Sequence, residues 1–133
     1  MAGLRIGYLI AKPEIAAKIR KNVVAMSNVL AVEAAKEALL DDAFYQFSLA
    51  KNREAKKRIY KLLDHLNLKY VESHTNFIFF HAKKDIRELG PAMLAKGVRI
   101  GRPFPPFYNW CRISTGTSQE VDKFISAMLE TYS

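Results

Sequence analysis

The spacing of apolar residues changes twice in the first third of the chain. Residues 2–11 alternate between two sets of positions, one of which carries the glycines, and this period of two predicts a strand. Pro13 suits the first turn of a helix, which we expect over about 13–22. Ser27 or Asn28 can cap a second, alanine-rich helix that ends near residue 41.

A long amphipathic helix is predicted from Asp42 to about Asn67. Its apolar residues recur at helical spacing and form one stripe. The stripe consists of Phe44, Phe47, Ala55, Ile59, Leu62, Leu63 and Leu66. Lysines and arginines crowd the remaining positions, so we expect one face to be buried and the other to be solvated.

The pattern changes to short β-prone runs after residue 67. Two strands are predicted over 68–72 and 76–81, and the second is apolar enough to be central in a sheet. A helix follows from Asp85 to Lys96, with Gly97 as its C-cap. Pro91 should kink this helix or mark a restart.

The stretch from Val98 to Thr117 is the most informative part of the sequence. Two β-prone runs, 98–100 and 110–115, flank a turn rich in proline and aromatic residues and predict a hairpin. Arg112 alternates with Cys111 and Ile113, so it should point away from their face. A guanidinium fixed mid-strand suits bidentate capture of a carboxylate or phosphate, although a solvated arginine has the same pattern.

A final helix is predicted from the capping signal of Thr117 or Ser118 with Glu120. From residue 68 onward the expected order is therefore strand, strand, helix, strand, strand, helix. Strands and helices in this arrangement indicate an α+β fold.

Composition adds a charge excess to this picture. The 133 residues, enough for one domain with a real core, contain 21 Lys and Arg against 13 Asp and Glu, a formal charge of +8. The excess fits an anionic partner, solubility, or one part of a larger balanced protein. Six cations gather in the long helix: Lys51, Arg53, Lys56, Lys57, Arg58 and Lys61. They predict either an anion-binding face or, with more support, a solvated helix face.

Other sites are excluded by residue type. No Gly-rich phosphate loop, nucleophile elbow or His/Cys cluster is present, so we expect no metal. Cys111 is the only cysteine, which fits a small core residue and a reducing compartment. With no apolar run near ~20 residues, we expect a cytoplasmic protein rather than a membrane protein.

Three segments taken together resemble the C-terminal part of a fold-type I pyridoxal-phosphate aminotransferase of the histidinol-phosphate kind. They are Ala2–Tyr8 (Ala-Gly-Leu-Arg-Ile-Gly-Tyr), Thr75–Phe80 (Thr-Asn-Phe-Ile-Phe-Phe) and Asn109–Thr117 (Asn-Trp-Cys-Arg-Ile-Ser-Thr-Gly-Thr). The likeness covers essentially the whole chain. It implies that residues 40–133 form the family's small domain, with strands covered by helices, and that residues 1–39 are a strand and helices left over from its large domain.

The resemblance also implies roles for two arginines. The family arginine that matches Arg5 holds the phosphate of the pyridoxal phosphate cofactor. The one that matches Arg112 anchors the acidic group of the substrate, an α-carboxylate or a phosphate. The parent reaction would move an amino group between a small-molecule amino donor and a 2-oxo acid, in a homodimer. The roles of Arg99, Arg102 and Asn109 stay open.

The family lysine that forms the Schiff base with the cofactor falls four positions before Met1. The resemblance therefore implies an enzyme whose isolated fragment is catalytically incomplete, with no catalytic residue inside the chain. Two alternatives are a stand-alone basic module that binds anions or nucleic acid through 51–61, nucleic acid being the less favoured partner, and a fragment that dimerises. Dimerisation would use apolar area exposed on 2–11 and on the alanine-rich helix.

Overall fold

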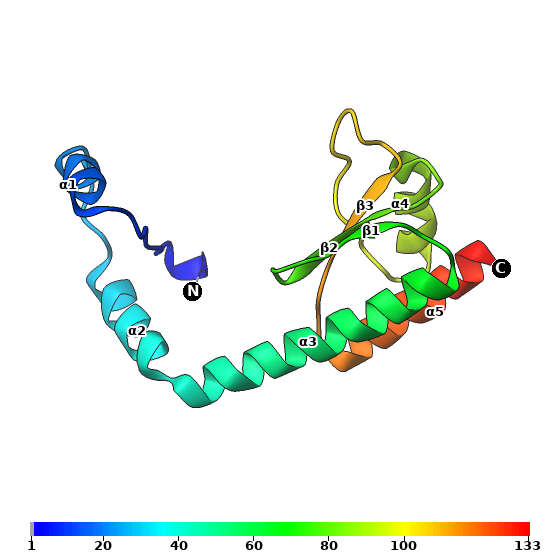
Figure 1. The fold of residues 1–133 in the computed structure, drawn as a ribbon, viewed down its shortest axis with the longest axis horizontal. Helices are drawn as coiled ribbons and strands as arrows, with labels where there is room; N and C mark the ends of the chain where they lie inside the picture. Colours follow the sequence, from blue (N-terminus) through cyan, green and yellow to red (C-terminus); the bar gives the residue numbers. More distant parts are fainter. Residues whose placement is uncertain (1) are drawn as a thin grey trace. The chain divides into compact units, whose positions relative to one another are not determined.

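The computed structural model describes residues 2–133, which divide into two units at Gln46 and Phe47. Its helices and strands are α1 (Pro13–Lys21), α2 (Val29–Leu40), α3 (Asp42–His65), β1 (Tyr70–Val71), β2 (Phe77–His81), α4 (Ile86–Ala95), β3 (Trp110–Ser114) and α5 (Ser118–Tyr132) (Figure 1). These elements confirm the predicted α+β class. The predicted domain boundary between residues 39 and 40 stays a prediction.

The first unit contains α1, α2 and the start of α3. Asn28 caps α2 as expected, because its Oδ1 accepts a hydrogen bond from the N–H of Leu30 at 2.9 Å. The strand expected over residues 2–11 is wrong: Ala2–Leu4 form a 3-10 turn, and 5–12 have no regular structure. A strand needs a paired backbone, and within residues 2–133 the three strands all belong to one sheet in the second unit.

The sheet of the second unit is antiparallel, in the order β1-β2-β3. The predicted central position of β2 is confirmed, and Phe79 on β2 pairs with Arg112 on β3. The strand expected over 98–100 is not formed. The N–H of Val98 donates instead to the carbonyl of Met93, near the end of α4. The backbone hydrogen bond between this segment and β3 comes from the next residues, where the N–H of Gly101 donates to the Arg112 carbonyl at 2.8 Å.

The core lies on one face of the sheet, where side chains of α3, α4 and α5 pack against the buried residues of β2 and β3. Its largest fully buried members are Phe80, Ile59, Leu63, Ile78, Leu89, Met93, Met128 and Cys111. The core position predicted for Cys111 is confirmed. Figure 1 shows α3 alongside α5, where an ion pair joins Arg58 to Asp122.

Capping residues set the boundaries of α4 and α5, close to the predicted positions. Asp85 caps α4 through the N–H of Arg87, and Gly97 after that helix has the left-handed φ of +77°. The restart considered at Pro91 is wrong, because α4 continues through it. Thr117 and Glu120 form the expected capping box of α5. Among the helices of residues 2–133, none is long and apolar enough to cross a membrane.

Candidate anion-binding site

The face of the sheet opposite the core carries an arginine among aromatic rings. Cys111 and Ile113 are buried, whereas Arg112 between them is only half-buried. The predicted alternation of β3 is therefore confirmed. Since Phe79 lies directly across from Arg112, Phe77 and Phe79 on β2 share this outer face.

The guanidinium of Arg112 lies near two aromatic rings. Its Cζ is 5.4 Å from the ring centre of Phe77 and 5.0 Å from that of Phe104. Phe104 meets Phe79 edge-on at 6.0 Å, and Phe79 stacks on Trp110 at 5.1 Å. The rings limit the rotamers of Arg112 and add cation–π attraction of about 0.5–2 kcal/mol each.

The charge of Arg112 is not balanced by a neighbouring carboxylate. Among the acidic residues that the structure describes, none lies within 4.0 Å of the Arg112 guanidinium, whereas Arg58 and Arg87 have ion pairs with Asp122 and Asp85. The planar fork of Arg112 is thus held by aromatic contacts and is open to ion pairing. This arrangement can bind a carboxylate or a phosphate.

Gly101 allows the backbone beside Arg112 to come close. A Cβ at Gly101 would lie 2.7 Å from the Arg112 carbonyl oxygen and 3.1 Å from its Cβ, so the first of these contacts is closer than atoms can approach. Arg102 follows, and its Cζ is 4.7 Å from the same Phe104 ring that Arg112 contacts. The loop therefore brings a second cation to the aromatic cluster.

Hydrogen bonds join the end of β3 to the residue before β2 and to α3. The N–H and hydroxyl of Thr115, just after β3, donate to the carbonyl of Asn76 at 2.8 and 2.9 Å. The same hydroxyl lies 3.0 Å from Oδ1 of Asn52 on α3, and the amide of Asn52 donates to the Thr75 carbonyl at 3.2 Å. Arg112 thus lies in a strand whose C-terminal end is fixed by hydrogen bonds.

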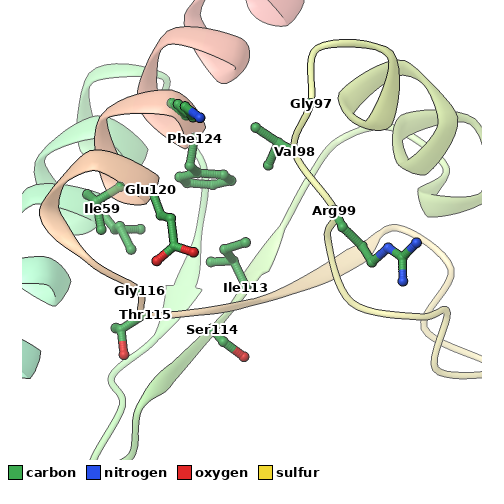
Figure 2. A pocket seen from close by; sticks show the side chains of 12 residues that line it. Ile59, Gly97, Val98, Arg99, Ile113, Ser114, Thr115, Gly116, Glu120 and Phe124 are labelled. Atoms are coloured by element: carbon green, nitrogen blue, oxygen red, sulfur yellow. The ribbon is translucent and has the colours of Figure 1, made fainter.

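A separate hollow of about 310 Å³ lies between α5 and the segment that follows α4 (Figure 2). Apolar side chains of Ile113, Phe124 and Val98 line it, with the carboxylate of Glu120 at one side. That carboxylate accepts hydrogen bonds from the N–H and hydroxyl of Thr117, and so serves the helix cap. The guanidinium of Arg99 extends away from Ile113 and Phe124 in this view. Arg112 does not line the hollow, and its chemistry belongs to the opposite face of β3.

Arg5 belongs to the first unit, and Arg112 to the second. The backbone of Arg5 has the left-handed φ of +56°, which costs a non-glycine residue about 1–2 kcal/mol. A Cβ added to Gly3 or Gly7, on either side of it, would meet nothing within 4 Å, so a ligand can approach this backbone closely. Arg5 itself is exposed.

The basic cluster on α3 is only partly available to a ligand. Lys51 pairs with Glu54 at 3.2 Å, Arg58 pairs with Asp122, and Lys56 donates to the Ser73 carbonyl at 2.7 Å. The other three, Arg53, Lys57 and Lys61, are exposed. Half of the cluster therefore has a partner within the second unit, and the other half remains for solvent or an anion.

Comparison with known proteins identifies the family. Residues 1–128 match the family model of aminotransferase class I and II. The chain belongs to this family. The aminotransferase chain is 34% identical over 135 residues to histidinol-phosphate aminotransferase 2 of Legionella pneumophila (strain Lens), covering 99% of this chain and 36% of that protein. It is 38% identical to histidinol-phosphate aminotransferase of Moorella thermoacetica, covering 98% of this chain and 34% of that protein.

Solved structures agree with the family and the fold. A proposed histidinol-phosphate aminotransferase from Erwinia carotovora atroseptica matches with a TM-score of 0.90 and 37% identity, over 98% of this chain and 38% of that one. The enzyme from Sinorhizobium meliloti, in complex with pyridoxal-5'-phosphate, matches with a TM-score of 0.79 and 28% identity, over 99% of this chain and 38% of that one. The aminotransferase chain thus spans little more than a third of the length of the relatives it matches.

Sequence reasoning named Arg112 but not the groups that hold it. Phe77 and Phe79 could be assigned to the same face only once the pairing of β2 with β3 was known. Phe104 and Gly101 come from a loop, where periodicity carries no information. The one available signal was the unusual density of aromatic residues and prolines between residues 103 and 108.

Proposed function

We propose that this chain supplies the anion-binding arginines of a pyridoxal-phosphate-dependent aminotransferase acting on a histidinol-phosphate-type amino donor and a 2-oxo acid. The observation that carries the proposal is the Arg112 guanidinium, which contacts two aromatic rings and faces no carboxylate among the described residues. Membership of the aminotransferase family supports a role for that cation in binding an acidic substrate. Relatives of this chain named histidinol-phosphate aminotransferases support the substrate class.

Arg112 is proposed to bind the acidic group of the substrate. Carboxylate and phosphate both offer two oxygens to the guanidinium fork, and two parallel hydrogen bonds fix the orientation of the group as well as its position. The rings of Phe77 and Phe104 lie beside the guanidinium and narrow the range of orientations that it can adopt.

Arg5 is proposed to bind the phosphate of the cofactor. The residues fit such a group, because the exposed cation lies between glycines whose surroundings are open. Pyridoxal phosphate, when bound, supplies the electron sink for amino transfer. The contribution of this chain would be to hold its phosphate and to orient the substrate.

We also propose that the isolated chain does not catalyse amino transfer, because the family lysine has no counterpart at a matching position within the 133 residues. Adding pyridoxal phosphate and then reducing with borohydride should leave no single stoichiometric lysine adduct. A specific adduct accompanied by turnover would contradict this part. A homodimer and a cytoplasmic location are further parts of the proposal.

A chimera tests the roles of the two arginines. In the Erwinia protein, the matching 38% of the chain is replaced by residues 1–133, and transamination of histidinol phosphate is measured. Arg112→Lys should raise KM for the acidic substrates by about 10- to 100-fold, since a bidentate charged contact is worth roughly 1.5–3 kcal/mol. Arg5→Lys should instead weaken the binding of pyridoxal phosphate.

The matched control is Arg53→Lys on the exposed side of α3, which should change neither quantity. An active chimera in which Arg112→Lys leaves KM unchanged would reject the proposed substrate contact. An inactive chimera that still binds pyridoxal phosphate would reject the proposed substrate class.

The alternative function, anion binding by the basic face of α3, draws on the exposed cations Arg53, Lys57 and Lys61. They follow one another at four-residue spacing and so share one side of the helix. A titration with single-stranded and double-stranded nucleic acid at several salt concentrations tests it. Steep loss of affinity with salt would support this face as a nucleic-acid site, and absence of binding at low salt would reject it.

A further inference from the structure

The rings beside Arg112 belong to a longer group of rings on the same face of the sheet. Phe79 on β2 pairs with Arg112 on β3, and at the neighbouring outward position His81 pairs with Trp110. Because alternate residues of a strand share a face, these side chains all point away from the core. The Trp110 ring stacks on Phe79 at 5.1 Å, with 25° between the planes, and meets His81 edge-on at 5.6 Å. Trp110 thus joins the ring of Phe79 to that of His81.

Phe104 reaches Arg112 from the loop between α4 and β3. Its ring meets Phe79 edge-on at 6.0 Å, and its centre is 5.0 Å from Arg112 Cζ. The backbone hydrogen bond at Phe104 is local, since its carbonyl accepts from the N–H of Phe107 at 2.7 Å. Phe79, Phe104 and Trp110 are half-buried, and none of the three belongs to the hydrophobic core of the described residues. Their positions therefore depend on contacts among themselves. We call the side chains His81, Trp110, Phe79 and Phe104 the aromatic row.

We propose that Trp110 is a positioning residue for the anion-binding arginine. Its ring stacks on Phe79, Phe79 contacts Phe104, and Phe104 lies against Arg112. Without the indole ring, Phe79 and Phe104 are free to change rotamer. The guanidinium of Arg112 then samples more orientations and binds an anion less tightly, because less of the binding geometry is formed in advance. This inference rests on the proposed role of Arg112 in binding the acidic group of the substrate.

His81 and Asn109 hold the other end of the aromatic row. Nε2 of His81 lies 2.7 Å from the amide nitrogen of Asn109, and Nδ1 accepts a hydrogen bond from the N–H of Lys83 at 3.3 Å. Both ring nitrogens thus have a partner, which fixes the imidazole plane at 88° to the Trp110 ring. Asn109 is exposed, so Asn109→Ala should leave the core intact and disturb the row more mildly than loss of Trp110.

NMR of arginine side chains in the isolated chain tests the positioning step without any ligand. Ring currents displace the signals of nuclei beside an aromatic ring, so the Nε–Hε signal of Arg112 reports its place among the rings. Arg112→Lys removes this signal and so assigns it. Trp110→Leu should move it toward the frequency of an exposed arginine such as Arg53, and Trp110→Phe, which keeps a stacking ring, should move it much less. Phe107→Leu, an exposed ring of the same loop, is the matched control and should leave it in place.

The chimera with the Erwinia protein measures the effect on binding. Trp110→Leu should raise KM for histidinol phosphate by about three- to tenfold, the size expected for the loss of one aromatic contact, and Trp110→Phe should restore most of it. Partial unfolding would instead lower the apparent kcat and leave KM unchanged. Combined with Arg112→Lys, Trp110→Leu should raise KM no further, because the side chain that it positions is already gone.

An Arg112 signal that stays in place in Trp110→Leu would overturn the inference, and so would a KM effect that adds fully to that of Arg112→Lys. If Trp110→Leu does not fold, Asn109→Ala decides: a displaced Arg112 signal supports the inference and an unchanged one rejects it. Failure of the proposed function looks different. In that case Arg112→Lys leaves KM of the chimera unchanged, while the NMR signals of the isolated chain still show whether Trp110 positions Arg112.

Discussion

At the scale of single residues, the alternation along β3 was enough to place Arg112 on the side away from the core. Burial of Cys111 and Ile113 confirms that placement. The alternation could not predict the aromatic rings around Arg112, because their positions depend on the register between β2 and β3 and on a loop residue, Phe104. Local spacing therefore predicts the direction of a side chain but not the groups that surround it.

The close approach of Gly101 to Arg112 leads to a prediction. Gly101→Ala places a Cβ 2.7 Å from the Arg112 carbonyl oxygen, which is backbone and cannot rotate away. We expect a loss of about 1–3 kcal/mol in the free energy of unfolding, together with weaker binding of anionic substrate by the chimera described above. Urea denaturation followed by circular dichroism measures the first effect.

Gly90→Ala is the matched control for this substitution. Gly90 lies in α4 with nothing within 4 Å of a Cβ, so alanine there should stabilise the helix by about 0.5–1 kcal/mol. If both variants change stability equally, the contact between Gly101 and Arg112 does not constrain the loop.

At the scale of helices and strands, cap residues were better guides than apolar spacing. Asn28, Asp85 and Thr117 begin α2, α4 and α5, because each supplies a side-chain oxygen to the first N–H groups of its helix. The two predicted strands that are not formed, over 2–11 and 98–100, have suitable apolar spacing but no partner strand in the described sheet. Alternating apolar residues indicate that a segment can form a strand, but a strand also needs a second segment to pair with. A helix cap needs no distant partner, because its hydrogen bonds form within four residues of the chain.

The capping box of α5 gives an element-scale prediction. Thr117 Oγ1 accepts from the N–H of Glu120, and the Glu120 carboxylate accepts from the N–H of Thr117. Thr117→Ala should therefore cost about 1 kcal/mol of stability, measured by urea denaturation. Ser126→Ala, an exposed position later in the same helix, should be neutral or slightly stabilising. Equal effects of the two variants would show that the cap contributes nothing to α5.

At the scale of the whole molecule, the apolar stripe of the long helix predicted burial correctly in one part of α3 and wrongly in another. The stripe of the long helix predicted the burial of Ala55, Ile59, Leu62 and Leu63, and these do pack in the core of the second unit. The same stripe predicted burial of Phe44 and Phe47, which are 64% and 56% exposed. Apolar spacing identifies one face of a helix. Burial of that face also requires another element to pack on it, and the sequence of the helix does not show which part of it will be covered.

Cys111 offers a probe of the integrity of the second unit. Burial raises the pKa of its thiol to about 12, so at mildly alkaline pH the reactive thiolate is about a thousandfold scarcer than for a free cysteine. Because the side chain is fully buried, a disulfide reagent should reach it only after the core opens. We therefore expect labelling of the native chain to be at least about a thousandfold slower than labelling of the denatured chain, and to accelerate with urea in parallel with the loss of helix signal.

A variant with the thiol moved to the surface, Cys111→Ala with Ser126→Cys, should react at the rate of a free thiol under native conditions, because residue 126 is exposed on α5. This control separates the effect of burial from any general property of the chain. Rapid native labelling of Cys111 would mean that the second unit opens readily when the rest of the aminotransferase fold is absent. Slow labelling would instead establish that its core of α3, α4, α5 and the sheet is stable in the isolated chain.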